Sequence, residues 1–127
     1  MNFKIDTKEK FTVITPEEIH LSDNLTEQLI NTAKEILQKD KSNVVLNLKQ
    51  IKTVNDEAAA KLVNLQQSFY ENNTSFVICE MQTSLAEKFE ELDLLELMNI
   101  TPSESEAWDI VQMEEMEREL LNGDDEL

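Results

Sequence analysis

Residues that commonly carry out covalent or metal chemistry are scarce in this sequence. It contains one histidine, His20, one cysteine, Cys79, and one glycine, Gly123. This composition excludes cysteine–histidine zinc sites and intramolecular disulfides. It also excludes the dinucleotide fingerprint and the Walker-type phosphate loop, because both need several glycines where the backbone approaches phosphate. We therefore expect no catalytic residues, no metal site and no cofactor.

One cluster of polar residues lies where the sequence predicts the start of a helix. Asn55, Asp56 and Glu57 come directly before Ala58, Ala59 and Ala60, which are strong helix formers. Side-chain oxygens at the start of a helix accept hydrogen bonds from unpaired N–H groups, and carboxylates interact favourably with the helix dipole. Helix capping is therefore the simplest explanation of the cluster.

The chain is strongly acidic. It has 127 residues, with 11 lysines and arginines against 27 aspartates and glutamates, for a net charge of −16. Residues 104–127 hold ten acids and one arginine, which is −9 of that total. Such a surface repels phosphate, so nucleic acid and anionic membranes are poor partners. With no signal-peptide pattern and no apolar run of membrane length, we expect a cytoplasmic location and no insertion into a membrane.

The hydrophobic pattern predicts an α/β fold. Apolar runs typical of buried strands alternate with segments of helical periodicity, which favours right-handed crossovers and a largely parallel sheet. We expect a mixed, mostly parallel sheet of four to five strands with about four helices. Thr83 or Ser84 is expected to cap the third helix, and partners are expected at the loops 16–24, 49–57 and 80–84. The expected strands are 3–6, 11–14, 44–48, 75–79 and 99–101, and the expected helices are 25–39, 55–71, 85–92 and from 104 onward.

Residues 44–62 resemble the STAS domain, named for sulfate transporters and anti-sigma factor antagonists. Residues 44–48 are similar to the family's third strand, in which an aspartate commonly stands at the position of Asn47. Residues 55–58 fall on the family's Asp-Ser-Ser/Thr-Gly motif. The resemblance covers about residues 3–112, so we expect a STAS-like domain over 1–112 and an acidic helical extension or tail over 113–127.

The resemblance implies a protein-binding regulator that is not an enzyme. In anti-sigma factor antagonists the motif serine is phosphorylated by a partner that is both kinase and anti-sigma factor, and the unmodified form binds that partner. Here the serine position is Asp56, which has no hydroxyl, and the glycine position is Ala58. The usual switch should therefore be absent. Asp56 is then either a helix cap or a fixed negative charge that imitates the phosphorylated form.

The resemblance also places the partner-binding surface at the start of the second helix. The expected partner is an ATPase-type anti-sigma kinase. The rival hypothesis is a structural STAS subunit of a membrane transporter assembly, which contacts a transporter ATPase and needs no phosphorylation. The expected binding residues are Asn55, Asp56, Glu57, Ala58 and Ala59, with Ser22 and Ser84 completing the surface.

The acidic C-terminal segment carries apolar residues at helical spacing. Met113, Met116, Leu120 and Leu121 would form a narrow stripe on an extended helix. One hypothesis is a solvated end that keeps the protein soluble. The other is that the stripe docks on a second copy, giving a homodimer, or on a basic groove of a partner.

Overall fold

The computed structural model describes residues 3–40 and 42–123, which form two β-sheets flanked by helices. The strands are β1 (Phe3–Thr7), β2 (Phe11–Pro16), β3 (His20–Leu21), β4 (Asn43–Asn47), β5 (Thr53–Val54), β6 (Phe76–Cys79) and β7 (Ile100–Thr101). The helices are α1 (Asp23–Asp40), α2 (Asp56–Glu71), α3 (Thr83–Glu91) and α4 (Glu104–Gly123), with a short 3-10 turn, η1 (Leu95–Leu97).

The main sheet has five strands in the order β1-β2-β4-β6-β7. Only β1 runs antiparallel to its neighbour, and the other pairs are parallel. The predicted mixed, mostly parallel sheet is therefore confirmed. Because β2, β4 and β6 point the same way, their carboxyl ends meet at one edge, where the following helices begin.

Alternate residues of the three central strands build two separate cores. Ile14, Leu46 and Ile78 are register partners and pack in the larger core with α1, α2 and α3. Their neighbours, namely Val13, Val45 and Val77, face the opposite way and pack in a smaller core with Ala107 and Val111 of α4. All six are buried. Because successive side chains of a strand point to opposite faces of the sheet, a continuous apolar run contributes to the cores on both faces.

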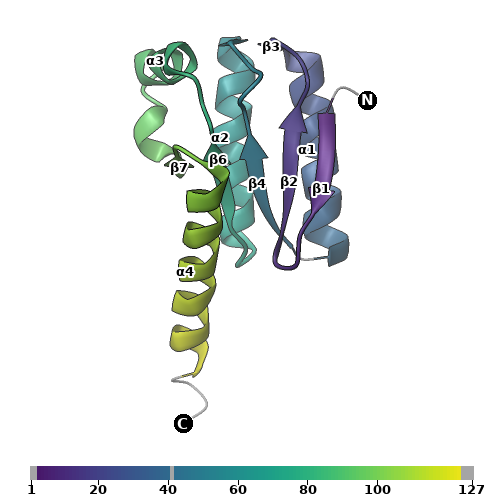
Figure 1. Cartoon of the computed structure of the whole chain (residues 1–127), viewed down its shortest axis with the longest axis vertical. Helices are drawn as coiled ribbons and strands as arrows, with labels where there is room; N and C mark the ends of the chain where they lie inside the picture. The colour runs from purple at the N-terminus through teal and green to yellow at the C-terminus, as the bar shows by residue number, and fades with distance from the viewer. Residues whose placement is uncertain (1–2, 41, 124–127) are drawn as a thin grey trace.

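The helices lie on opposite faces of the sheet. Figure 1 shows α1 and α2 on the far face and α4 on the near face, where α4 runs past the lower end of the strands. Residues 113–123 of the predicted extension continue the same helix that begins at Glu104, whereas residues 1–2 and 124–127 lie outside the described part of the chain. Within the described ranges, no helix is both long and apolar enough to cross a lipid bilayer.

Two local features differ from the prediction. The short parallel pair of β3 and β5 was not expected, because strands of two residues carry no periodicity. The prediction that Thr83 or Ser84 caps α3 is wrong. Thr83 is already the first residue of the helix, and Gln82 holds the cap position without a side-chain capping bond to any described residue. The buried side chains of Leu85 and Phe89 hold this helix against the core.

Candidate functional site

The link between β4 and α2 is fixed by its own contacts. Leu48 and Ile51 are fully buried, and the Ile51 N–H donates to the Leu48 carbonyl at 3.1 Å. The Lys49 N–H donates to the side-chain oxygen of Asn47 at 3.0 Å. The Gln82 side chain donates to the Lys49 carbonyl at 2.9 Å and ties the link to the start of α3. The link that leads into α2 is therefore held by hydrogen bonds within itself and by one from the start of α3.

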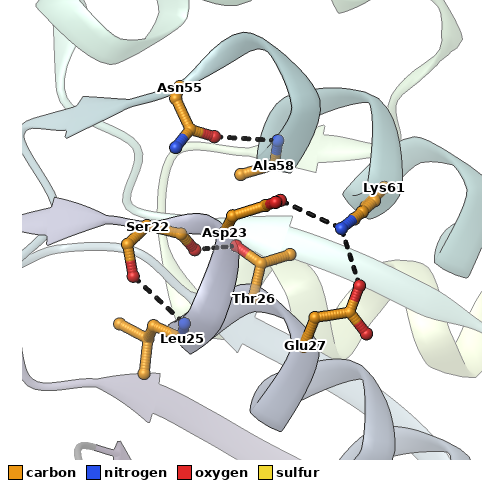
Figure 2. Close-up of polar contacts among 8 residues, drawn as sticks. All are labelled: Ser22, Asp23, Leu25, Thr26, Glu27, Asn55, Ala58 and Lys61. Carbon is orange, nitrogen blue, oxygen red and sulfur yellow. Dashed lines mark hydrogen bonds and ion pairs between the residues drawn. The ribbon is translucent and has the colours of Figure 1, made fainter.

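Asn55 caps α2, and Asp56 follows it as the first helical residue. The Asn55 backbone is extended, with φ −87° and ψ 163°, and its side-chain oxygen accepts the Ala58 N–H at 3.0 Å. Figure 2 shows this bond at the start of the helix. Because the capping role belongs to Asn55, the Asp56 carboxylate remains available for other contacts.

The Asp56 side chain points to solvent and is paired with Lys88 of α3. Its exposed fraction is 67%, and its Oδ1 lies 2.9 Å from the Lys88 ammonium. The hydrogen bond and the charge of Asp56 raise the pKa of Lys88. Exposed ion pairs contribute little to stability because water and salt screen them. The pair therefore contributes little to the stability of the fold, and its main effect is that Lys88 partly offsets the negative charge of Asp56.

The start of α1 lies beside the start of α2. The Ser22 hydroxyl oxygen accepts the Leu25 N–H at 3.1 Å, so Ser22 caps α1. Lys61 of α2 reaches across to Asp23 at 3.0 Å and to Glu27 at 2.6 Å, as Figure 2 shows. These two hydrogen-bonded carboxylates raise the pKa of Lys61. The three charged groups join the two helix starts into one surface.

The loop before β3 adds an apolar residue to this surface. The Ile19 carbonyl accepts the N–H groups of Lys52 and Thr53 at 2.7 and 3.2 Å. The Ile19 side chain nevertheless stays 63% exposed. Next to it, His20 Nδ1 lies 2.7 Å from the Thr53 hydroxyl. The loop before β3 thus presents an isoleucine beside β5, close to the start of α2.

A shallow hollow separates β5 from α3. Its volume is about 480 Å³, and Ser84 is exposed on its wall. Two lysines and two glutamates line it, so its charge is balanced. The lining residues are Lys52, Thr53, Val54, Ser84, Glu87, Lys88 and Glu91.

The predicted binding residues differ in their burial: Asp56, Glu57 and Ser84 are exposed, whereas Ser22 and Asn55 are half-buried. Ala58 and Ala59 are fully buried, so their methyl groups belong to the core and offer no side-chain surface to a partner. Sequence reasoning missed two residues that do lie at the surface, Ile19 and Lys88. The exposure of Ile19 was indicated by its isolated position in the polar segment 17–20. The position of Lys88 depends on how α3 packs and could not be predicted from the sequence. We define the α2 patch as Ile19, Ser22, Asn55, Asp56, Glu57, Ser84 and Lys88.

Below the α2 patch, Asn47 joins two carboxylates at the carboxyl edge of the sheet. Its side chain is buried, and its Nδ2 donates to Glu80 at 3.1 Å and to Glu104 at 3.2 Å. An amide supplies the two N–H donors that this arrangement needs, whereas a carboxylate has none. Burial, reinforced by the charges of Glu80 and Glu104, raises the pKa of the neighbouring Cys79 thiol to about 12. Cys79 therefore stays protonated and acts as a packing residue.

Comparison with protein families gives one decisive match. The model of the STAS domain matches residues 8–107. The chain belongs to the STAS domain family. Among curated protein sequences, none is similar enough to match it.

Solved structures of STAS domains have the same fold at low sequence identity. A STAS domain protein of Planctomyces limnophilus, described as an anti-sigma-factor antagonist, is 17% identical, with a TM-score of 0.74 over 87% of this chain and 97% of its own. The Bacillus anti-sigma factor antagonist SpoIIAA, in its unphosphorylated form, is 15% identical, with a TM-score of 0.69 over 87% and 96%. Its phosphorylated form gives 0.64 at 14% identity over 86% and 98%.

The fold also occurs inside a much larger membrane protein. The murine anion transporter Slc26a9 matches 85% of this chain with 18% of its own length, at a TM-score of 0.64 and 10% identity. At these identities the similarity establishes the fold alone. The predicted STAS fold is therefore confirmed, and the role of the α2 patch has to be argued from its own residues.

The capping geometry predicts that Asn55 and Asp56 differ in their effect on stability. Asn55→Ala should lower the free energy of unfolding by about 0.5–2 kcal/mol, because the Ala58 N–H loses its acceptor. Asp56→Ala should cost less, because an exposed first-turn carboxylate contributes its interaction with the helix dipole and a solvent-screened ion pair with Lys88. Urea unfolding followed by circular dichroism measures both. A larger loss for Asp56→Ala would show that the cap is wrongly assigned.

The Asn47 contacts predict a pH-dependent loss of stability if Asn47 is replaced by aspartate. Asn47→Asp places a third carboxylate against Glu80 and Glu104 and should lower the free energy of unfolding by about 2–4 kcal/mol at pH 7. Its like-charged neighbours raise the pKa of the introduced carboxyl in the folded state, so the defect is full above that pKa and shrinks as the pH falls through it. Asn47→Ala is the control. A defect of Asn47→Asp that does not shrink relative to the control between pH 7 and pH 4 would contradict this account.

Proposed function

We propose that this STAS domain is a protein-binding regulator of the anti-sigma factor antagonist type and that the α2 patch is its contact surface. The observation that carries the proposal is that Asp56 is the exposed first residue of α2. From the resemblance of residues 55–58 to the family's motif, we infer that Asp56 stands at the serine position. The family match and the similarity to SpoIIAA support a role in binding protein rather than in catalysis. An anti-sigma partner would place this function in the cytoplasm.

The chemistry of the α2 patch suits contact with another protein. It combines an exposed isoleucine with polar groups fixed by caps and ion pairs, so little conformational entropy is lost on binding. Ser22, Asn55 and Asp56 stand at the starts of two adjacent helices, and Ser84 and Lys88 come from a third. We propose an ATPase-type anti-sigma kinase as the partner.

The carboxylate at position 56 replaces the phosphorylation switch with a fixed state. A phosphoserine carries about −1.5 to −2 charge and three acceptor oxygens, whereas a carboxylate carries −1 and two oxygens. Lys88 lies within 2.9 Å and offsets that single charge. Asp56 is therefore a weak copy of the phosphorylated form, and we propose that the protein binds its partner without being switched by phosphate at this position.

The transporter hypothesis keeps one supporting observation, the occurrence of this fold in the anion transporter Slc26a9. A structural subunit of a transporter assembly would need no phosphorylation and would use the same exposed surface. Affinity purification of the full chain from native lysate separates the two functions. Recovery of an anti-sigma kinase supports the first proposal, and recovery of a transporter ATPase replaces it with the second.

Restoring the hydroxyl should restore the switch. Purified chain is incubated with ATP and an ATPase-type anti-sigma kinase of the same organism, and phosphate incorporation is located by mass spectrometry. We expect Asp56→Ser to be phosphorylated at position 56, and the unchanged protein and the control Asp56→Ala to be unmodified there. If Asp56→Ser binds the kinase and stays unmodified at position 56, the proposed replacement of the switch is wrong.

The same variant tests whether Asp56 acts as a fixed negative charge. If that charge weakens binding as phosphate would, Asp56→Ser should bind the kinase more tightly in a titration without ATP. Lys88→Gln should have the opposite effect, because it leaves the Asp56 charge unpaired. Unchanged or weaker binding of Asp56→Ser would show that Asp56 does not imitate the phosphorylated form. Asp56 would then differ from the family's serine only in lacking a hydroxyl that can be phosphorylated.

A further inference from the structure

The outer face of α4 carries an apolar stripe. Met113, Met116 and Leu120 are 54%, 64% and 69% exposed. At about 100° per residue, they fall within an arc of roughly 60° on the helix surface. Leu121, at 72% exposed, falls roughly 80° outside this arc and is not part of it. We define the α4 stripe as Met113, Met116 and Leu120.

The opposite face of α4 is fixed to the body of the protein, so the stripe cannot turn inward. Ala107 and Val111 are buried against the sheet. Glu114 accepts the hydroxyl of Tyr70 at 2.8 Å, and Glu115 accepts the Asn43 side chain at 3.1 Å. One turn further, Arg118 donates to the Ser75 hydroxyl at 3.2 Å. These contacts come from α2, from β4 and from the residue before β6, and they fix the rotation of the helix about its axis.

The spacing of the stripe is that of a coiled-coil seam with acidic flanks. Positions 113, 116 and 120 correspond to a, d and a of a heptad, which places Glu117 at e and Glu119 at g. Residues at e and g face the partner helix and select it by charge. Two copies of this chain would bring glutamate against glutamate in addition to their net charges of −16 each. A second copy is therefore a poor occupant.

The acidic flanks also oppose the stability of the free helix. The carboxyl end of a helix carries partial negative charge, which favours cations, yet the last turn of α4 has no basic residue and Glu119 stands just before it. A cationic partner would relieve this unfavourable interaction. The charge and the apolar spacing thus select the same kind of occupant.

We propose that the α4 stripe docks an amphipathic helix of another protein, whose apolar positions are flanked by lysine or arginine. Figure 1 shows α4 leaving the sheet at the end opposite to α3 and β3, beside which the α2 patch is built. The stripe therefore leaves the α2 patch free, and the protein can hold two partners at once. This inference is independent of the function proposed for the α2 patch.

Three synthetic peptides test the proposal on the full chain. The first is a labelled 21-residue helix with leucine at a and d and lysine at e and g. The second has the same composition in scrambled order, and the third has glutamate at e and g. Fluorescence anisotropy at 150 mM salt should show the first peptide binding at least tenfold more tightly than either of the others.

Charge-neutral variants locate the binding. The double variant Met116→Gln and Leu120→Gln should weaken binding of the first peptide at least tenfold, whereas Leu97→Gln, an exposed leucine of η1, should leave it unchanged. Circular dichroism checks that both variants keep their helices. Equal binding of the scrambled peptide would mean attraction by charge alone and would overturn the proposal, as would unchanged binding by the double variant. A dimer in sedimentation that the double variant abolishes would make a second copy the occupant and overturn it too.

Discussion

The parallel pairing of β4 between β2 and β6 is the constraint on which the rest of the structure depends. Val44, Val45 and Leu46 are fully buried, so both faces of β4 must be covered and the strand cannot shift its register by one residue. This arrangement sends the chain out at the same edge as the ends of β2 and β6. The starts of α1, α2 and α3 then have to gather there, which places Ser22, Asn55 and Ser84 on one surface.

Two asparagine side chains hold this edge of the sheet. At the buried position of Asn47, a carboxylate would repel the two carboxylates that the amide contacts. The Asn47 side chain donates to Glu80 and Glu104 at the end of β4, and the Asn55 side chain caps α2. Asp56 follows Asn55, and among the described residues its side chain is held only by the exposed ion pair with Lys88. A residue with so little structural work is one that a protein can exchange between serine and aspartate without disturbing the fold. Under the proposed function, the difference between a binding surface switched by phosphate and a fixed one resides in this one side chain.

The fold was largely predictable because the strands and helices have different periods. The apolar runs 44–48 and 75–79 predicted buried strands, and the switch to alanines after Glu57 predicted α2. The features that escaped prediction depend on tertiary contacts. The pair of β3 and β5 forms because the Ile19 carbonyl meets the link after β4, and α3 begins at Thr83 because its buried face fixes it there. Likewise, the ion pair of Asp56 with Lys88 cannot be predicted without knowing where α3 packs.

The most direct test of the account is to map the surface that an anti-sigma kinase covers. The full chain, labelled with nitrogen-15, is titrated with an unlabelled ATPase-type anti-sigma kinase of the same organism, and amide chemical shifts are followed by NMR. The account predicts the largest changes at residues 19–22, 55–57 and 84–88, with small changes along the outer strand β1. Unchanged signals at the start of α2, together with large changes on β1, would contradict it.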